Sequence, residues 1–435
     1  MLNIIDKSKI SETDFLNKLK ERNQVELDDI TNNVKVILDD IKSNGDNAVF
    51  KYTEKFDNVK LTKNSIKIKK EDILKAYDNI EDRYIEILKK AKDNIYKFHK
   101  RQITNSWITN ENEGETLGQI VRPLERVGIY SPGGTASYPS SVLMNAVTAK
   151  VAGVQKIIMF TPPKNEGVNS AILVAADIAG VDEIYCVGGA QAIGAMAFGT
   201  DSVEKVDKIV GPGNIYVNTA KRMVFGYCDI DMFAGPSEIL IIADETANPK
   251  YIAADLMAQA EHDVLSSSIL ITPSEKMVKE TLKEIKVQIK DKKRKDIIEK
   301  SFENYGAAII VKDINEAIRI SNVIAPEHLE LCIENPFEKL NSIKNAGALF
   351  MGNYSPEPLG DYFAGTNHVI PTSGTAKFFS PLNVDDFVKK TSLIYYTKEA
   401  LNKVKSDISY FAKKEGLDVH GDAVDIRFEE NKKNI

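Results

Sequence analysis

Hydrophobic residues recur with helical spacing in the first part of the chain. In residues 28–57, DDITNNVKVILDDIKSNGDNAVFKYTEKFD, apolar positions lie three or four residues apart, and Gly45 is a stop signal. A second long amphipathic pattern covers residues 65–102. Both patterns predict helices that pack as a scaffold, and residues 1 to about 125 are expected to be mostly helical.

From about residue 117 to residue 382 short apolar runs alternate with helical stretches. SSVLMNAVTAKVAGV and NSAILVAADIAGV are two of the helical stretches. The β-rich runs include KIIMFTPP, DEIYCVGG, DKIVGPGN, EILIIAD, SSILIT and AAIIV. This alternation predicts parallel sheets covered by helices, and there are enough strands for two such sheets. Residues 383–435 are expected to form a polar, mainly helical tail.

Three predicted strands run directly into glycine-containing loops, at residues 131–141, 187–194 and 210–214. Loops at the carboxyl ends of parallel strands form the ligand crevice of doubly wound sheets, and glycine lets the backbone approach a ligand. None of the three loops is G-x-G-x-x-G, so a tight turn without a ligand would explain any one of them. Three in succession favour a nucleotide site.

Length, charge and cysteine content exclude several classes of protein. With 435 residues, two or more domains are expected. The 57 basic and 63 acidic residues give a net charge of −6, so neither nucleic acid nor an anionic membrane is attracted by global charge. No apolar stretch could span a bilayer and the N-terminus has no signal-peptide pattern, so we expect a cytoplasmic protein. Cys186, Cys228 and Cys332 include no CxxC pair, which argues against a disulfide framework or a cysteine zinc cluster.

One predicted helix carries an unusual polar pair. Asn248-Pro249 is a favourable helix start, and Ile252, Leu256 and Gln259 then fall on one stripe that His262 continues. A buried polar pair needs partners, which could be protein groups, a metal ion or a substrate. Without further observations, a hydrogen-bonded core pair is the more common arrangement.

The few histidines of the chain have chemically suggestive neighbours. The chain has five histidines, which are His99, His262, His328, His368 and His420. All of them except His99 lie beside acidic, amide or glycine residues. Scarce imidazoles beside carboxylates suit a metal site together with an acid/base site. The sequence separations do not by themselves establish a spatial cluster.

Several longer segments carry a resemblance to a known family. In chain order they are GIYSPGGTASYPSSVLMNA, VGGAQAIGA, VGPGN, DMFAGPSE, AQAEHD, APEHLE, GDYFAGTNHVIPTSGTA and EGLDVHGDAV. Together they closely resemble the histidinol dehydrogenase family over nearly the whole chain, most loosely before residue 115. The AGPSE and QAEHD blocks are the most specific.

The resemblance implies an α/β fold with two Rossmann-like doubly wound domains and helical extensions at both ends. We expect an N-terminal helical arm at 1–25 and an inserted Rossmann-like domain at 130–237. The larger α/β domain, at 26–129 and 238–382, is expected to carry most zinc and catalytic residues. A C-terminal helical tail at 383–435 is expected to reach the partner subunit of a homodimer.

The resemblance also implies the reaction and its cofactors. The family oxidises L-histidinol to L-histidine through L-histidinaldehyde, consuming two NAD. The implied zinc ligands, for one Zn²⁺ per subunit, are Gln259, His262, Asp361 and His420. The amide oxygen of Gln259 would be a weak ligand, which leaves the ion able to accept substrate atoms.

The acid/base residues implied by the family are Glu327 and His328. His328 fits the base for the alcohol proton, and Glu327 fits the base that activates water for aldehyde oxidation. The positions that match substrate contacts are Ser237, Gln259, His262, His328, Asp361, Glu415 and His420. The positions that match NAD contacts are Tyr130, Gln191 and Asn214. His368 lies in a matched block as an active-site contact of undefined role.

Other interpretations stay open at this point. A related zinc- and NAD-dependent dehydrogenase could act on another polar alcohol, although the acidic Glu415 favours a cationic substrate. A zinc hydrolase on an α/β scaffold and a nucleotide-binding protein without catalysis are the alternatives outside the oxidoreductases. Formation of NADH from histidinol would discriminate among them.

Overall fold

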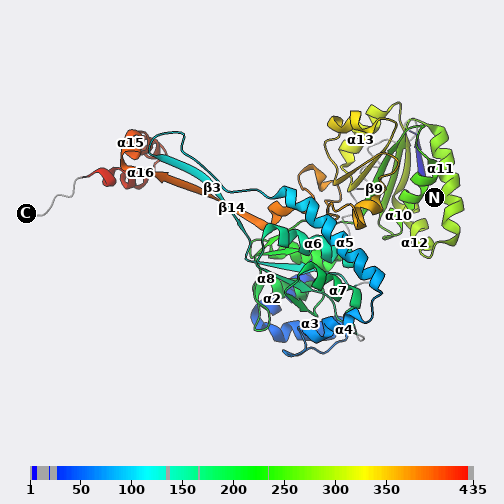
Figure 1. Ribbon diagram of the computed structural model, residues 1–435, viewed down its shortest axis with the longest axis horizontal. Helices are drawn as coiled ribbons and strands as arrows, with labels where there is room; N and C mark the ends of the chain where they lie inside the picture. Colours follow the sequence, from blue (N-terminus) through cyan, green and yellow to red (C-terminus); the bar gives the residue numbers. More distant parts are fainter. Residues whose placement is uncertain are drawn as a thin grey trace, which may run out of the picture. The chain divides into compact units, whose positions relative to one another are not determined.

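The chain forms two compact units (Figure 1). The computed structural model describes residues 2–6, 19, 27–133, 138–164, 167–233 and 235–429. The first unit consists of Met1–Ile103 and Leu124–Phe387, and the second consists of Thr104–Pro123 and Val388–Ile435. The first unit contains two parallel sheets covered by helices, which confirms the predicted α/β class. No helix in the described part of the chain is long and apolar enough to cross a membrane.

The first parallel sheet has the strand order β6-β5-β4-β7-β8. Its first strand in the sequence lies in the middle, and the chain then adds strands on one side before it crosses to the other. This matches five strands of the doubly wound dinucleotide-binding order 3-2-1-4-5-6, with the switch point between β4 and β7. The strands are β4 (Arg126–Tyr130), β5 (Lys156–Phe160), β6 (Glu183–Tyr185), β7 (Lys208–Val210) and β8 (Asp229–Ile230).

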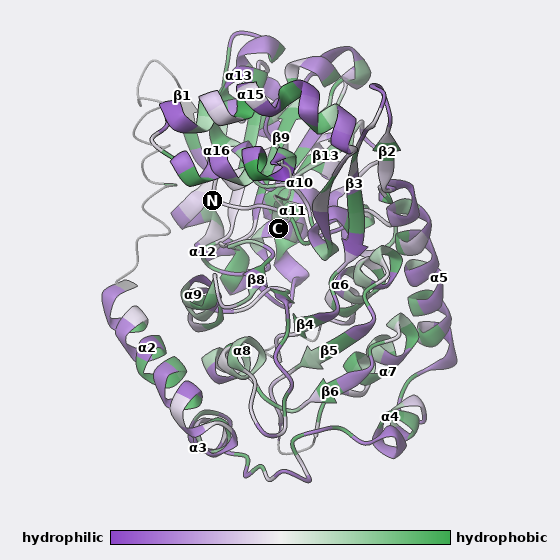
Figure 2. Cartoon of the chain, turned by 90° about the vertical axis from the view of Figure 1, so that its left-hand side faces the viewer, coloured by the Kyte–Doolittle hydropathy of each residue, from purple (hydrophilic) through white to green (hydrophobic). Residues whose placement is uncertain are grey.

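Two groups of helices cover this sheet. On one face lie α8 (Gly189–Phe198) and α9 (Ile215–Val224), with α2 (Leu27–Asn44) and α3 (Asp46–Asp57) packed on them. The other face is covered by α6 (Pro139–Ala152), α7 (Ser170–Ala179), α4 (Lys70–Tyr77) and α5 (Asp82–His99), the last being followed by the short η1 (Lys100–Gln102). Hydrophilic and hydrophobic residues alternate along α2 and α5, as expected for helices with one buried face (Figure 2). The predicted stop at Gly45 is confirmed, because α2 ends at Asn44 and Gly45 has a φ of 51°.

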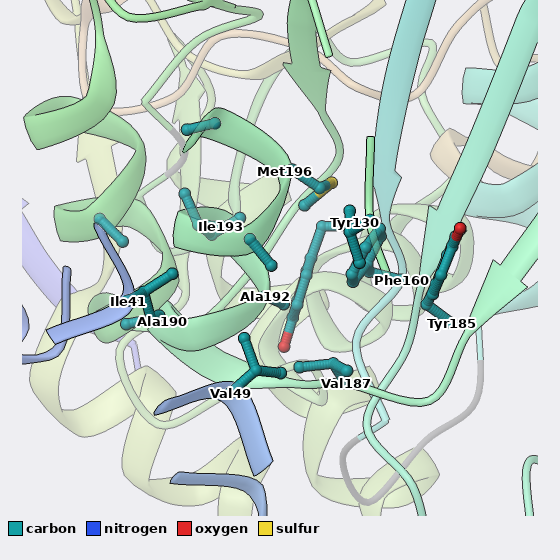
Figure 3. Close-up of a cluster of buried hydrophobic side chains, with 14 of the residues drawn as sticks. Ile41, Val49, Tyr130, Phe160, Tyr185, Val187, Ala190, Ala192, Ile193 and Met196 are labelled. Atoms are coloured by element: carbon teal, nitrogen blue, oxygen red, sulfur yellow. The ribbon is translucent and has the colours of Figure 1, made fainter. Parts of the chain in front are cut away.

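Large side chains fill the space between the first sheet and α8. Figure 3 shows Ala192 and Met196 of α8 beside the ring of Tyr130, with Ile193 of the same helix in the same core. The rings of Phe160 and Tyr185 stack with centroids 4.8 Å apart. Tyr130 is 3% exposed and ends β4, so its hydroxyl reaches the edge of this core. The packing therefore holds Tyr130 rigidly at the carboxyl end of the central strand.

The second parallel sheet repeats the same winding. Its order is β1-β11-β10-β9-β12-β13, with β9 as the first strand of the wound part and β1 added at one edge. The strands are β9 (Glu238–Ala243), β10 (Ser267–Thr272), β11 (Gly306–Ile310), β12 (His328–Cys332), β13 (Ala348–Met351) and β1 (Asn3–Asp6). One face is covered by α10 (Pro249–Ala260), α11 (Glu275–Gln288), which η2 (Ile289–Asp291) follows, and α12 (Lys295–Tyr305). The other face is covered by α13 (Ile314–Ile324) (Figure 1).

Short helical segments follow β12 in the chain. The segment η3 (Pro336–Ser342) lies between β12 and β13, and α14 (Glu357–Tyr362), η4 (Thr375–Lys377) and η5 (Val384–Phe387) follow β13. Of these, α14 follows β13 directly and carries part of the site described below.

The second unit is a three-stranded antiparallel sheet followed by helices. The sheet has the order β14-β3-β2, from β14 (Val388–Tyr396), β3 (Glu115–Pro123) and β2 (Trp107–Thr109). It is followed by α15 (Lys398–Lys414), α16 (Asp418–Asp425) and η6 (Ile426–Phe428). Residues 388–396, expected within a mainly helical tail, therefore form a strand. Their β-branched and aromatic residues pair over nine positions with a strand about 270 residues earlier in the sequence.

Three further features differ from the expected organisation. Residues 3–6, expected in a helical arm, form β1, and most of that arm lies outside the described residues. Helices α2 to α5 pack on the first sheet, whereas the domain bounds implied by the family resemblance placed residues 26–129 in one domain with residues 238–382. The first sheet also begins at Arg126, before the expected boundary at 130. Helix packing onto a sheet depends on contacts across the fold, which local periodicity does not contain.

Candidate active site

Helix α10 positions the polar pair seen in the sequence. The Asn248 side chain accepts a hydrogen bond from Lys250 N at 3.0 Å and caps the helix that Pro249 begins. Gln259 is fully buried in the last turn, and its Oε1 has no hydrogen-bond partner within the described structure. His262 follows the helix end, with Nδ1 3.3 Å from Gln259 Nε2. The structure thus brings the pair together and leaves one buried amide oxygen without a partner.

Helix α14 supplies two carboxylates to the same place. Glu357 and Asp361 are four residues apart, so one helical turn puts them on one face. Ligand atoms of His262, Glu357 and Asp361 all lie within 4.8 Å of one another. Glu357 is 1% exposed, and its Oε2 has no hydrogen-bond partner among the described residues. We did not single out Glu357 in the sequence, although its spacing from Asp361 in PEPLGD was a usable signal.

The first turn of α14 is held by a second buried carboxylate. Glu330 of β12 accepts a hydrogen bond from Glu357 N at 2.8 Å. Burial raises the pKa of Glu330 well above its usual range, and the neighbouring Asp255 carboxylate raises it further. Burial likewise raises the pKa of Asp255 to about 6. Glu330 therefore fixes the backbone of Glu357, and Asp255 adds a further carboxylate near it.

Strands β9 and β12 hold the two acid/base candidates in place. Glu327 Oε2 accepts a hydrogen bond from Glu238 N at 2.7 Å, and Glu238 Oε2 accepts one from Glu327 N at 3.4 Å. His328 Nδ1 lies 2.9 Å from the carbonyl oxygen of Glu238. A carbonyl oxygen only accepts, so Nδ1 carries the proton and Nε2 of neutral His328 has a free lone pair. That Nε2 lies 3.8 Å from Asp361 Oδ1 and 4.0 Å from Glu357 Oε1.

The electrostatics of the cluster follow from burying several carboxylates around one imidazole. Burial raises the pKa of Glu327 to about 8 and that of Glu357 to about 7, while His328 opposes both shifts. Burial by itself lowers the pKa of His328, but the charges of Glu327, Glu357 and Asp361 prevail and raise it to about 10. Burial disfavours the Asp361 carboxylate, yet the facing His328 ring, 3.8 Å away, and the neighbouring His368 and His262 hold the Asp361 pKa below the usual range. Such an acid-rich pocket is favourable for a bound cation.

His368 connects this cluster to the first sheet's helices. Its Nδ1 lies 2.9 Å from the carbonyl oxygen of Asp361, and its Nε2 lies 3.0 Å from Ser141 Oγ of α6. The ring therefore fixes the backbone at Asp361.

Ser237 is half-buried and immediately precedes Glu238. The cluster accordingly lies at the amino ends of β9 and β12.

The positions expected to contact NAD lie at the carboxyl ends of the strands of the first sheet. Tyr130 ends β4, Gln191 lies in the first turn of α8, and Asn214 caps α9. Gln191 is 1% exposed, and its Oε1 has no hydrogen-bond partner in the described ranges. Gly211 follows β7 with a φ of 108°, and a Cβ there would come within 2.2 Å of the Tyr130 carbonyl oxygen. The two switch-point strands thus approach closely, and only glycine fits between them.

Glu415 and His420 belong to the second unit. Glu415 follows α15 and His420 lies in α16, and both are exposed. The first unit contains the remaining predicted zinc ligands, the acid/base pair and the NAD positions. Glu238 and Glu357, which sequence reasoning missed, are in contact with these residues in the same unit.

Comparison with known proteins gives one consistent family. The family described as histidinol dehydrogenase matches residues 20–428. The chain is similar to histidinol dehydrogenase from Clostridium acetobutylicum, with 56% identity over 429 residues, covering 98% of this chain and 99% of that protein. It is similar to histidinol dehydrogenase from Listeria innocua, with 56% identity over 417 residues, covering 96% and 97%. A crystal structure of histidinol dehydrogenase from Elizabethkingia anophelis has a TM-score of 0.92 and 40% identity, covering 98% of both chains.

Proposed function

Since the chain belongs to the histidinol dehydrogenase family and is an oxidoreductase that oxidises histidinol in histidine biosynthesis, we propose that it uses zinc and NAD for this chemistry. The proposed reaction is the four-electron oxidation of L-histidinol to L-histidine through L-histidinaldehyde, with two NAD consumed. The observation that carries the proposal is the cluster of His262, Glu357 and Asp361, together with Gln259, which contacts His262 and has a buried amide oxygen without a partner in the described residues. Nitrogen and oxygen donors of this kind suit Zn²⁺.

We assign the zinc ion, one per subunit, to Gln259, His262, Asp361 and His420. His262 and Asp361 fit the assignment because their ligand atoms lie within 4.8 Å of each other. Gln259 fits it because its side chain contacts His262 and its buried Oε1 has no partner among the described residues. Glu357 lies close enough to support the ion or to orient its ligands. When bound, zinc supplies a Lewis acid and NAD supplies the hydride acceptor.

His328 is the proposed base for the alcohol oxidation. Its Nδ1 proton is committed to the carbonyl oxygen of Glu238, so Nε2 is the atom that can accept the hydroxyl proton of the substrate. The carboxylates of Asp361 and Glu357 face this nitrogen and favour the protonated ring that results. A divalent cation held beside those carboxylates would weaken their field at His328 and would favour the neutral ring before the reaction.

Glu327 is the proposed base for the second oxidation. Its carboxylate is fixed by Glu238 N, so it can take a proton from water that adds to the aldehyde carbon. Cysteine chemistry is not required for this step. Burial raises the pKa of the thiols of Cys186 and Cys228 to about 12, which leaves them as unreactive thiols at neutral pH.

The substrate is proposed to lie between the two acid/base residues and the zinc ligands. Ser237, Glu415 and the ligand residues Gln259, His262, Asp361 and His420 are the proposed contacts. Histidinol carries an imidazole and an ammonium group, so a carboxylate such as Glu415 suits its charge. Tyr130, Gln191 and Asn214 are the proposed NAD contacts, and the buried Oε1 of Gln191 offers an acceptor there.

We further propose a homodimer in which the C-terminal segment completes the partner's site. Glu415 and His420 belong to a unit that is separate from the other predicted site residues. This unit exposes large apolar side chains, among them Ile394, Tyr395 and Val419. A partner surface would bury them, which favours association through this unit.

The proposal is tested by incubating purified protein with L-histidinol and NAD. We expect two NADH per histidinol consumed, about one zinc per chain, and loss of activity on chelation that added zinc restores. Absence of NADH formation would contradict the enzymatic assignment. Full activity after exhaustive chelation would contradict the metal assignment alone.

A further inference from the structure

Asp57, at the end of α3, has a carboxylate that none of the preceding roles uses. Its Oδ2 is buried and has no hydrogen-bond partner in the part of the chain that the structure describes. The side chain is half-buried, so water reaches part of it. A buried carboxylate oxygen without a donor is unfavourable, and it is common where a ligand supplies the missing donor.

The fold brings Asp57 to the carboxyl edge of the first parallel sheet. After α3 the chain returns to pair antiparallel with β6, with Ile68 N bonded to Ile184 O and Cys186 N bonded to Ile66 O. The residues before Ile66 therefore approach from the carboxyl end of β6. Val49 of α3 lies in the same core as Tyr130 and Val187, and the Tyr130 hydroxyl points toward both (Figure 3).

The electrostatics agree with this placement. Burial raises the pKa of Tyr130 to about 12, and the negative charge of Asp57 contributes to the rise. The Tyr130 hydroxyl in turn accepts a hydrogen bond from Gly189 N at 3.0 Å, in the first turn of α8. The charge of Asp57 therefore acts on Tyr130 at the end of β4, and Gln191, whose Oε1 has no partner, lies in the helix turn that bonds Tyr130. Two of these three offer acceptor oxygens that lack a donor.

A dinucleotide site of this topology needs an acid for the adenosine ribose. In doubly wound folds that residue usually follows the second strand and accepts a hydrogen bond from the 2′-hydroxyl. The second strand here is β5, and the four residues after it are Thr161, Pro162, Pro163 and Lys164, without a carboxylate. The usual acid is therefore missing from those four residues, while Asp57 approaches the same edge from outside the sheet.

We propose that Asp57 accepts a hydrogen bond from the adenosine 2′-hydroxyl of NAD and excludes the 2′-phosphate of NADP. The inference rests on the proposed use of NAD and adds a cofactor-specificity residue to it. A ribose hydroxyl supplies the donor that Asp57 Oδ2 lacks. A 2′-phosphate would place a second negative charge beside the carboxylate in a partly buried place. Burial raises the pKa of Asp57 to about 6, so the carboxylate is ionised at neutral and higher pH.

The test compares Asp57→Asn with the wild-type enzyme in histidinol oxidation, with NAD and NADP as alternative cofactors. We expect the KM for NAD to rise roughly tenfold, the fold-change of one charge-assisted hydrogen bond, and the preference for NAD over NADP to fall by a similar factor. The KM for histidinol and the zinc content should not change. Glu54→Gln removes an exposed carboxylate one turn earlier on α3 and serves as the matched control, with wild-type values throughout.

A cofactor analogue makes the test independent of how well the variant folds. NAD that lacks the adenosine 2′-hydroxyl should have a higher KM with the wild-type enzyme and no further effect with Asp57→Asn. An unchanged KM for the analogue with the wild-type enzyme overturns the inference, as does a variant with the wild-type KM for NAD and cofactor preference. A wild-type enzyme that does not reduce NAD contradicts the proposed function itself, so the two failures are distinguishable.

Discussion

Lys221→Met is expected to destabilise the first parallel sheet strongly, because it breaks a fully buried ion pair. The side chains of Lys221 and Asp231 are each 1% exposed, and Lys221 Nζ donates to Asp231 Oδ1 and, at 3.0 Å, to the carbonyl oxygen of Gly211. Asp231 also accepts hydrogen bonds from Gly211 N at 2.8 Å and from Met232 N at 2.7 Å. Both backbone groups of Gly211, at the switch point, therefore depend on this pair.

The magnitude follows from leaving one charge without its partner. Removing one member of a buried pair costs about 3–5 kcal/mol. If Lys221→Met and Asp231→Asn acted independently, the double variant would lose about 6–10 kcal/mol by the same principle. The double variant carries no buried charge, so its loss should be nearer the roughly 2–4 kcal/mol of a few missing hydrogen bonds. The expected coupling is therefore at least about 2 kcal/mol.

The assay is urea unfolding followed by far-UV circular dichroism, with hydrogen exchange of amides in residues 208–231. Trp107 is the single tryptophan and lies in the second unit, so its fluorescence would not report on this sheet. Lys63→Met is the matched control, because its ion pair with Asp201 has side chains 63% and 77% exposed and should contribute nothing measurable. A Lys221→Met variant within about 0.5 kcal/mol of wild type, or a double variant with additive losses, would refute the reasoning.

Three further predictions concern the proposed active site. The Glu327→Gln variant should oxidise the aldehyde at least two orders of magnitude more slowly and should retain its zinc. In the wild-type enzyme, the rate of this step should fall as the pH drops through about 8, where the Glu327 carboxylate becomes protonated. Stopped-flow reduction of NAD from histidinaldehyde measures both effects, and loss of zinc from the variant would make Glu327 a ligand instead. The Glu357→Gln variant should keep its fold but bind zinc roughly 10–100-fold more weakly, since the substitution removes a charge beside His262. Competition with a chelator measures this affinity, and an unchanged value would show that Glu357 does not support the metal ion. The inactive variants His262→Ala and His420→Ala should recover activity when they are unfolded and refolded together. About a quarter of the wild-type activity is expected, because half of the dimers are mixed and each mixed dimer has one intact site. If no activity returned, His420 would belong to the site of its own chain.

Local patterns in the sequence were sufficient for several features. The Asn248-Pro249 start, the stripe that leads to Gln259, and the stop at Gly45 each depend on contacts within a few residues. The alternation of apolar runs and helices likewise predicted parallel sheets, because strands buried on both faces are largely apolar; every position of β9 and β10 is buried. Family resemblance then supplied the expected ligands and acid/base residues, whose roles remain predictions.

The local sequence did not reveal that Glu238 and Glu357 belong to the candidate site. Glu238 matters because β9 and β12 are neighbours in register, which sets its backbone N and O against Glu327 and His328. Glu357 matters because α14 turns one face toward His262, almost one hundred residues earlier. Neither neighbour is near in sequence, so no local spacing records the contact.

What the sequence determined by itself was therefore the kind of elements and their chemistry, and what the tertiary structure decided was which elements meet. Strand order, helix packing and the antiparallel pairing of β14 with β3 all join segments separated by tens to hundreds of residues. The pKa values of Glu327 and His328 also belong to this second class, because burial and neighbouring charge arise only after the chain has folded. Periodicity and capping act over one or two turns, whereas a buried carboxylate cluster results from long-range packing.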